Sequence, residues 1–321
     1  MVPEPLAVAS AGRMRALIVT NMYPSPEAPA RGSFVRDQVR ALERIDGVEL
    51  ELFTFEPGGG RPYAQAIGEA RRRYRGRRFD VVHSHFGLTA WPAFAVRAGI
   101  HALTMHGNDL VHPRSRAITL AALPFLDIPA VVSEQFTDRV PQWALRKPLQ
   151  VLPCGVATDR FRPIPRAEAR AHLGLDAGGR YLLFPHDPAR PVKRFADAEA
   201  VAGDVPLLTM GRVDPDEVPY YVNAANAVLV TSEWESLGLA VLEALACDVP
   251  VLATPTGVHA EVLAGVSGTY CGPFEAARWR SELAPALAAE DPRIEGRDRV
   301  ERFSSDQTAA RVLDAWRAAL G

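Results

Sequence analysis

Short apolar segments recur along this chain at regular intervals, and amphipathic segments separate them. This alternation is typical of β-α-β units, in which helices bury both faces of a parallel sheet. The apolar segments form two series, one at residues 16–20, 48–55, 80–83, 102–106, 130–133 and 150–152, the other at 181–184, 205–210, 227–231 and 249–253. The sequence therefore predicts an α/β protein with two parallel-sheet domains.

Three prolines, Pro153, Pro163 and Pro165, separate the two series. Prolines at this density interrupt regular structure and are typical of a linker. We expect the first domain at residues 14–152, the second at 153–304 and a last helix at 305–321. Residues 1–13 hold two prolines and only a short apolar run, too short for a signal peptide or a membrane span. We expect this tail to be disordered or non-native.

Composition narrows the class of protein. The chain has 321 residues, 48% of them hydrophobic and 23% charged, and its formal net charge is −2. The apolar content suffices for two cores, and the net charge gives no field that would attract nucleic acid. Cys154, Cys247 and Cys271 are widely spaced and form no C-x-x-C pair, so neither a disulfide framework nor a zinc site is indicated. We expect a soluble cytoplasmic enzyme without a metal or a nucleic-acid partner.

The segment 235–246 carries the strongest local signal. It follows an apolar strand, turns at Gly238 and enters an apolar helix. Unpaired N–H groups at a helix start, here Gly238 and Leu239, suit an anion such as a diphosphate. From that helix Glu243 can accept hydrogen bonds from two ribose hydroxyls, and Glu235 in the loop can bind sugar hydroxyls. The alternative is that Glu235 caps the helix and Glu243 is a solvated surface carboxylate.

Two glutamates separated by seven residues, followed by the sequence of 244–257, resemble the retaining family-4 glycosyltransferases, also described as glycosyl transferases group 1. The resemblance includes residues 218–233 before the first glutamate. It implies the GT-B fold, in which two Rossmann-like domains face each other across a cleft and a C-terminal helix crosses back to the first domain. It also implies metal-independent, retaining transfer of a hexosyl group from a nucleotide-diphosphate sugar to an acceptor hydroxyl. Glu243 would then bind the ribose and Glu235 the transferred sugar.

Cations follow the first strand of the second series. Arg190 and Lys193 match the arginine and lysine that stabilise the departing diphosphate in the family, although their spacing is short and Pro185-His186 replaces the usual Gly-Arg. Such charges neutralise a leaving phosphate without a metal. Arg194 is an alternative to either of them, and a solvated basic loop is the alternative to the site.

Two histidine-containing segments occur at the ends of strands of the first series. In His106-Gly-Asn-Asp109, the resemblance makes His106 a contact of the donor sugar and places Asp109 near the reacting centre or the acceptor. A histidine at a strand end is otherwise more often a hydrogen-bonded part of the structure. His83 and His85 also match the family, and we expect them to shape the wall of the cleft rather than to catalyse.

The loop after the first strand ends in Arg31-Gly32, where a helix begins. A glycine at that point allows backbone amides to reach the donor, and Arg31 is either an acceptor contact or a surface charge. Gly211 and Arg212 lie where the family holds the nucleobase, largely through the backbone. The sequence does not choose between uridine and guanosine, so the donor is expected to be a UDP- or GDP-linked sugar.

Six arginines cluster in one short segment: Arg71, Arg72, Arg73, Arg75, Arg77 and Arg78. They exceed what a helix C-terminus needs and would suit an anionic membrane surface, although a solvated helix end explains them as well. We expect a glycan or lipid-linked acceptor and peripheral association with the inner face of the membrane. The alternatives in function are a nucleotide-sugar epimerase or hydrolase on the same fold, or a catalytically silent sugar-nucleotide-binding subunit.

Overall fold

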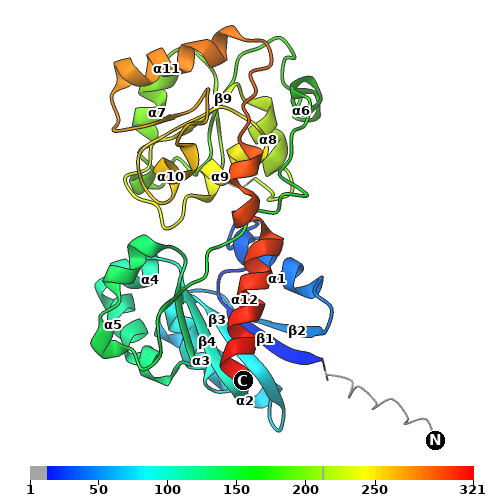
Figure 1. The fold of residues 1–321 in the computed structure, drawn as a ribbon, viewed down its shortest axis with the longest axis vertical. Coiled ribbons are helices and arrows are strands. Elements are labelled where there is room, and N and C mark those ends of the chain that lie inside the picture. The colour runs from blue at the N-terminus through cyan, green and yellow to red at the C-terminus, as the bar shows by residue number, and fades with distance from the viewer. Residues whose placement is uncertain (1–12, 212) are drawn as a thin grey trace, which may run out of the picture.

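The computed structural model describes residues 13–211 and 213–321, and it holds two parallel sheets (Figure 1). The first sheet has the order β2-β1-β3-β4-β5-β6 and the second β11-β10-β9-β7-β8. The strands of the first are β1 (Met14–Thr20), β2 (Val48–Thr54), β3 (Arg78–His85), β4 (Arg97–Met105), β5 (Ile128–Val131) and β6 (Gln150–Val151). Those of the second are β7 (Leu182–Phe184), β8 (Leu207–Thr209), β9 (Ala227–Val230), β10 (Val251–Ala253) and β11 (Tyr270–Cys271). The predicted fold class is confirmed.

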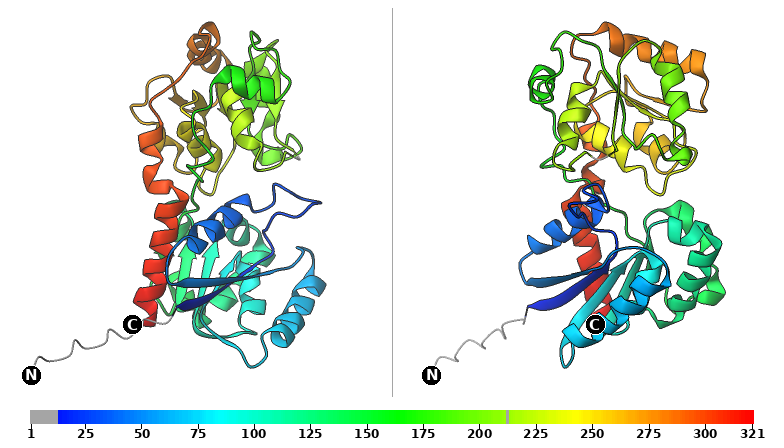
Figure 2. Two further views of the ribbon diagram at one scale, coloured as in Figure 1. Left: turned by 90° about the vertical axis from the view of Figure 1, so that its right-hand side faces the viewer. Right: turned by 180° about the vertical axis from the view of Figure 1, so that it is seen from behind.

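Helices connect the strands of each sheet and cover its faces (Figure 2). The first domain has α1 (Ser33–Glu43), α2 (Gly60–Arg73), α3 (Ala90–Ala93), α4 (Asn108–Val111) and α5 (Pro113–Ala122). The second has α6 (Arg166–His172), α7 (Phe195–Ala202), α8 (Val218–Ala224), α9 (Leu239–Ala246), α10 (His259–Leu263) and α11 (Ala276–Ala288), and α12 (Ser305–Leu320) ends the chain. Arg212 and the predicted tail, except Arg13, lie outside the described residues.

Strand order reverses once in each sheet, and this reversal fixes where ligands can bind. In the first sheet, β2 lies outside β1 and β4 lies outside β3, on opposite sides of the β1–β3 pair. In the second sheet, β8 lies outside β7 and β10 lies outside β9 in the same way. Connections after these strands leave toward opposite faces, so a crevice opens beyond their carboxyl ends. The loops that follow β1, β7 and β9 carry predicted site residues, and His106 and Asp109 follow β4, the neighbour of β3.

The last helix, α12, packs on the first domain and completes its core (Figures 1 and 2). Val312, Leu313 and Trp316 are buried in one cluster with side chains of α1, β1, β3 and β4. The indole N–H of Trp316 donates to His83 Nδ1 at 3.1 Å. The chain thus crosses between the domains twice, first at the linker and again at α12.

The two crossings run side by side. The amide of Val156 donates to Phe303 O at 2.8 Å, and the amide of Ser305 donates to Val156 O at 2.8 Å. A Cβ on the neighbouring Gly155 would lie 2.5 Å from Ser305 Cα and 2.3 Å from Thr308 Oγ1. Only glycine fits there, and the linker is therefore fixed against the start of α12.

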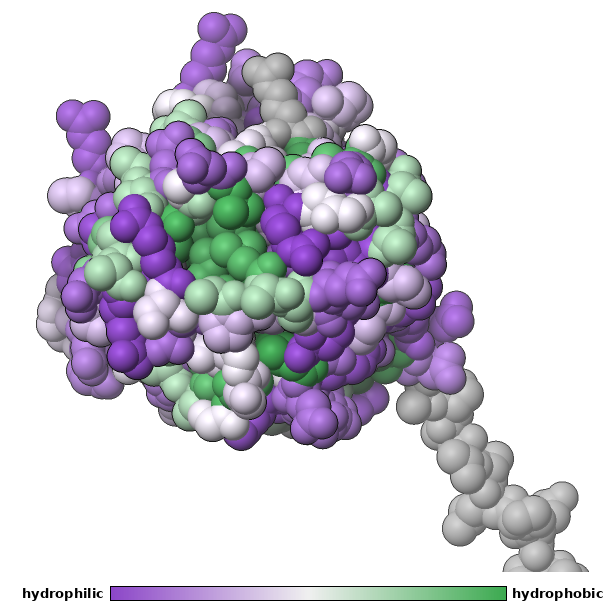
Figure 3. All heavy atoms as spheres, turned by 90° about the horizontal axis from the view of Figure 1, so that it is seen from above, coloured by the Kyte–Doolittle hydropathy of each residue, from purple (hydrophilic) through white to green (hydrophobic). Residues whose placement is uncertain are grey.

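Figure 3 shows the end of the second domain that lies away from the first, where a mostly hydrophilic surface surrounds an apolar patch.

The strand β11 was not predicted, because its two residues form no apolar run. Within 13–211 and 213–321, no helix has the length and apolar character needed to span a membrane.

Replacing Trp316 with alanine should destabilise the protein by about 3–5 kcal/mol, because the side chain is fully buried in the first core. Trp316→Phe keeps most of the packing but leaves His83 Nδ1 without its donor, so its effect should be smaller, about 1 kcal/mol. Denaturant unfolding measures both. Arg317→Ala on the exposed face of the same helix is the control, and equal losses for Trp316→Ala and Arg317→Ala would contradict this packing.

Candidate active site

A cleft with a volume of about 800 Å³ lies between the two domains, and residues of both line it. Its walls come from the loops after β1 and β4 on one side and from those after β7 and β9 on the other. Most of the predicted site residues line this one space: Arg31, Gly32, His106, Arg190, Lys193, Glu235, Gly238, Leu239 and Glu243. The fold thus brings together residues as far apart in the sequence as Arg31 and Glu243.

A buried ion pair forms the centre of the second-domain wall. Lys193 Nζ lies 2.6 Å from Glu235 Oε1, and both side chains are almost completely buried. Ser232 Oγ donates to the same oxygen at 2.7 Å. Among the described residues no hydrogen bond engages Glu235 Oε2, so this atom remains available to a ligand hydroxyl. Glu235 is not a helix cap, because it precedes α9 by a full loop.

A polar and a charged neighbour keep Glu235 ionised. Burial alone would raise its pKa, but His186 and the Lys193 ammonium lower the pKa well below its usual range. His186 Nε2 lies 3.5 Å from Glu235 Oε1, longer than a hydrogen bond, and burial lowers the pKa of His186 to about 4. His186 is therefore neutral at pH 7, and its cleft-lining ring has a buried nitrogen without a hydrogen-bond partner. Pro185-His186 replaces the usual Gly-Arg of the family, and His186 thus places an uncharged polar ring in the site.

Two helix N-termini face the cleft, one from each domain. Gly238 precedes α9 with φ 103°, and Gly32 precedes α1 with φ 62°. A Cβ would lie 2.3 Å from His259 Nε2 at Gly238 and 2.1 Å from Met22 O at Gly32, so both positions require glycine. The unpaired N–H groups and the helix dipoles favour an anion at both ends.

The predicted cations separate into two groups. Lys193 is buried beside Glu235, and Arg190 is exposed at the edge of the cleft that it lines. Arg194 instead pairs with Asp197 and lies over the Phe274 ring, 5.5 Å from its centroid. Arg194 is therefore engaged outside the cleft, and Arg190 and Lys193 remain the candidates for binding a diphosphate.

Glu243 lies in α9, one turn after the helix start, and lines the cleft rather than the outer surface. Burial raises its pKa to about 8, the Arg160 charge lowers it, and the Asp37 charge raises it. Arg160 Nη2 donates to Asp37 Oδ2 at 2.5 Å, and Arg160 Nη1 also bonds Pro215 O. Arg36 Nη2 reaches Asp216 Oδ1 at 3.1 Å. This network joins α1 of the first domain to the loop 213–217 of the second, next to Glu243.

On the first-domain wall, His106 lies at the end of a row of three neutral histidines. Its Nε2 lies 3.1 Å from His85 Nδ1, and its ring is 5.0 Å from that of Phe34. His85 stacks on His83 with ring centroids 4.8 Å apart. Burial lowers the pKa of all three well below the ordinary value. They carry no charge at pH 7, and of the three only His106 lines the cleft.

Two predicted residues lie elsewhere. Asp109, expected as an acceptor or sugar contact, has no exposed surface. Its carboxylate accepts from the amides of Gly87, His106 and Gly107 at 2.8–3.1 Å, so it holds the turn that presents His106. Gly211 is exposed after β8 and is not among the described residues that line the cleft, and Arg212 is not described.

Sequence reasoning missed three residues that join the walls. Ser133 and Gln135 follow β5 in the first domain and donate to backbone carbonyls of the Glu235 loop. Ser236 Oγ in turn donates to His106 O at 2.6 Å. A common polar loop gives no local signal for such contacts. Only the place of each residue after a strand, β5 for Ser133 and Gln135 and β9 for Ser236, could have suggested them.

Replacing Glu243 with glutamine should change the dependence of stability on pH. The unfolded carboxyl ionises near pH 4.3 and the folded one near 8, so wild-type stability falls between these values while that of Glu243→Gln does not. The Tm of the variant minus that of the wild type should therefore rise from pH 5 to 8 and then level off. Glu290→Gln, on an exposed carboxylate, is the control. A Tm difference independent of pH would mean that Glu243 is ionised in the folded state.

Comparison with known proteins agrees with this geometry. D-inositol 3-phosphate glycosyltransferase from Segniliparus rotundus is 28% identical over 301 residues, which cover 76% of this chain and 67% of that protein. The enzyme of the same name from Thermobispora bispora is 26% identical over 352 residues, covering 87% and 78%.

Solved structures show the same fold. Sucrose-phosphate synthase from Thermosynechococcus elongatus superposes with a TM-score of 0.73 at 19% identity, covering 95% of this chain and 98% of that one. Anabaena HepE, in complex with UDP-glucose, gives a TM-score of 0.67 at 17% identity over 94% and 100%.

The family matches divide at the linker, as the sheets do. Residues 17–160 match the family described as Glycosyltransferase Family 4, and residues 198–301 match the one described as Glycosyl transferases group 1. The matched ranges include the first sheet from residue 17 onward, the strands β8–β11 and every described site residue predicted from the sequence except Arg190 and Lys193, which lie with β7 between the two ranges. The chain therefore belongs to the family-4, group 1 glycosyltransferases.

Proposed function

We propose that this glycosyltransferase moves a hexosyl group from a nucleotide-diphosphate sugar to an acceptor hydroxyl, with retention at the anomeric carbon and without a metal. The observation that carries the proposal is the buried Lys193–Glu235 pair, set in the cleft between two helix N-termini. One end of the site suits a diphosphate, and Glu235 Oε2 suits a sugar hydroxyl. A nucleotide sugar combines these two chemical groups in one molecule.

Stabilisation of the leaving group is assigned to the cations and the helix ends. Cleavage of the anomeric C–O bond places negative charge on the β-phosphate. Lys193, Arg190 and the α9 N-terminus are positioned to neutralise that charge. The first-domain wall offers no carboxylate base among its described residues, so we propose that the departing phosphate takes the proton of the attacking hydroxyl on the same face of the sugar. Attack on that face gives retention.

We propose a UDP-linked donor, with a GDP-linked donor as the alternative. Anabaena HepE, which has the same fold, binds UDP and UDP-glucose. Glu243 lies one turn from the α9 tip, where a ribose attached to the diphosphate would reach it. The carboxyl is held beside Arg160, and donor hydroxyls would supply the hydrogen bonds that its buried carboxyl lacks.

The proposed acceptor is a glycan or a lipid-linked glycan, used in the synthesis of a cell-surface polysaccharide or glycolipid. The first-domain wall is polar but nearly uncharged, with Asn21, Tyr63, Asn108 and Ser115 in it. Among its described residues Arg31 is the only Arg, Lys, Asp or Glu, and Arg31 pairs with Glu56 at 2.5 Å. Such a wall favours hydroxyl groups over the anionic acceptor that the name of the inositol phosphate enzymes indicates.

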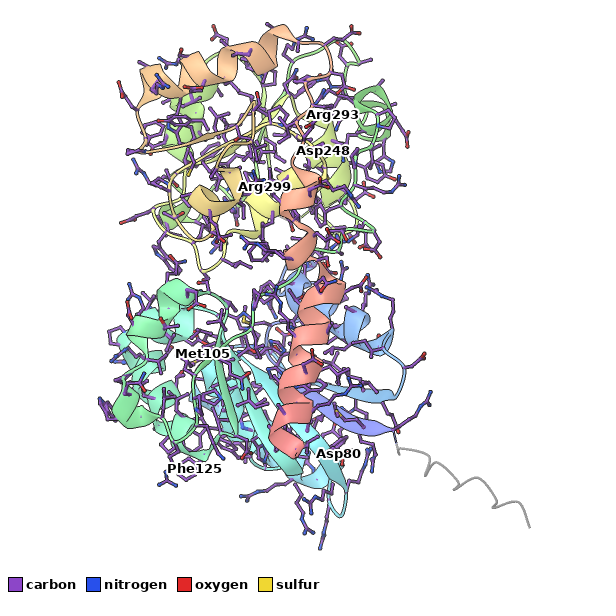
Figure 4. All side chains as sticks on the ribbon, viewed as in Figure 1. Asp80, Met105, Phe125, Asp248, Arg293 and Arg299 are labelled. Carbon is purple, nitrogen blue, oxygen red and sulfur yellow. The ribbon has the colours of Figure 1, made fainter. Side chains whose placement is uncertain are left out.

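We further propose that the arginine-rich segment holds the protein at an anionic membrane surface. Arg71, Arg72, Arg75 and Arg78 are exposed, whereas Arg77 pairs with Glu51. The segment ends α2 and begins β3, at the sheet edge opposite the cleft, where Figure 4 labels Asp80. The eight residues of β3 separate the two edges by about 23 Å. An acceptor bound to the same membrane would therefore need a long glycan to reach the site.

Nucleotide binding tests the donor site. In a thermal-shift panel of UDP, GDP, ADP and dTDP, we expect UDP to raise the Tm by a few degrees, because a ligand of the folded state stabilises it. Glu243→Ala should lose the ribose contact and Lys193→Ala the phosphate contact. UDP should therefore no longer raise the Tm of either variant. A shift with no nucleotide would overturn the donor site and favour the silent subunit.

Turnover separates the enzymatic alternatives. With UDP-glucose alone, an epimerase or hydrolase would consume the donor, whereas the proposed transferase should do so only slowly. Addition of a glycan acceptor panel should accelerate UDP release, and NMR of the first product should show the anomeric configuration of the donor. The same rate with EDTA present would support metal independence, and loss of activity restored by Mg²⁺ would contradict it.

Vesicle sedimentation tests the membrane surface. We expect binding to vesicles with 30% phosphatidylserine, on the order of 1 kcal/mol per arginine near the surface, and little binding to pure phosphatidylcholine. Reversing the charge of Arg71, Arg72 and Arg75 to glutamate should abolish it. The matched control reverses Arg278, an exposed arginine of the second domain. Equal binding by both variants would exclude the arginine-rich segment as the contact.

A further inference from the structure

The loop Glu235–Ser236 of the second domain makes direct hydrogen bonds to the first domain at the cleft. Gln135 Nε2 donates to Glu235 O at 2.7 Å and to Ser236 O at 2.9 Å. Ser133 Oγ donates to Ser236 O at 2.6 Å. Both donors come from the first domain, just after β5. The backbone that follows the Glu235 side chain is therefore held from across the cleft.

The same loop returns a hydrogen bond in the opposite direction. Ser236 Oγ donates to the carbonyl of His106 at 2.6 Å. The next residue, Gly107, has φ 102°, and a Cβ there would lie 2.5 Å from Ser236 Oγ and 3.0 Å from Phe136 Cζ. Gly107 thus leaves room for Ser236, and Asp109 fixes the turn around it. The turn that presents His106 and the loop that presents Glu235 are tied to each other.

We propose that Ser133 and Gln135 are positioning residues that fix the position of the Glu235 carboxylate through its backbone. They thereby strengthen the binding of the sugar part of the donor and not that of the nucleotide part. The inference rests on the proposed function, in which Glu235 binds the transferred sugar. Lys193 and Ser232 hold the same carboxylate from its own domain. The sugar site is then complete only when the two domains are joined at this loop.

The nucleotide half of the site should be independent of these contacts. Helix α9 is anchored by Val241, Leu242 and Leu245, which are fully buried in the second core. Removing a bond to Glu235 O or Ser236 O frees the loop before Gly238 but leaves that anchor in place. Loss of Ser133 or Gln135 should therefore affect UDP-glucose and not UDP, a difference that general unfolding or a loosened core would not produce.

The binding test compares two ligands by isothermal titration calorimetry. Gln135→Leu, which removes two hydrogen bonds, and Ser133→Ala, which removes one, should each weaken the binding of UDP-glucose roughly three- to tenfold and leave the affinity for UDP unchanged. The double variant should lose at least as much as the stronger single one. Glu134→Gln, an exposed neighbour in the same turn, is the matched control and should bind both ligands as the wild type does.

A second measurement needs no ligand. Hydrogen–deuterium exchange of the peptide 232–240 should be faster in Gln135→Leu and Ser133→Ala than in the wild type and in Glu134→Gln, because the loop opens more often. If the wild type binds neither UDP nor UDP-glucose, the proposed donor is wrong and the exchange still decides whether the loop is held. Unchanged exchange, or equal weakening of UDP and UDP-glucose, would overturn the positioning role.

Discussion

Parallel strands place all of their carboxyl ends at one edge of a sheet, and the function of this protein depends on that constraint. Each sheet brings its chemistry to the edge that faces the other sheet. The loops after β7 and β9 supply Lys193 and Glu235, and those after β1 and β4 supply Gly32 and His106. With all strands running the same way in each domain, a single cleft collects residues from both halves of the chain.

The two walls of the cleft differ in charge, and the difference matches the two kinds of substrate proposed for them. The second-domain wall holds an ionised pair whose members keep each other charged despite burial. The first-domain wall has a buried row of neutral histidines, of which only His106 lines the cleft, and polar uncharged groups beside it. In the proposed function, the charged diphosphate would bind the second-domain wall and the neutral acceptor the first-domain wall. The hydrogen bonds of Ser133 and Gln135 join the walls where the two substrates would meet.

The sequence predicts the parts of the site that depend on local order. Glu235, Gly238 and Glu243 follow from one strand-turn-helix pattern, and the structure places all three in the cleft. Asp109 shows the limit, because its position after a strand does not reveal that its side chain turns inward to three backbone amides. Gln135 shows another, since its partner lies 100 positions away. Such contacts depend on the docking of two domains, which no local pattern encodes.

Helix α12 belongs to the first domain by its contacts but follows the second domain in the chain. Val312, Leu313 and Trp316 fill a core whose other members are made much earlier. During synthesis, the first sheet therefore emerges with an apolar surface that lacks its covering helix until the second domain has also emerged. The first domain cannot reach its final stability as an independent unit on the ribosome, and a nascent chain must keep that surface from aggregating in the interval.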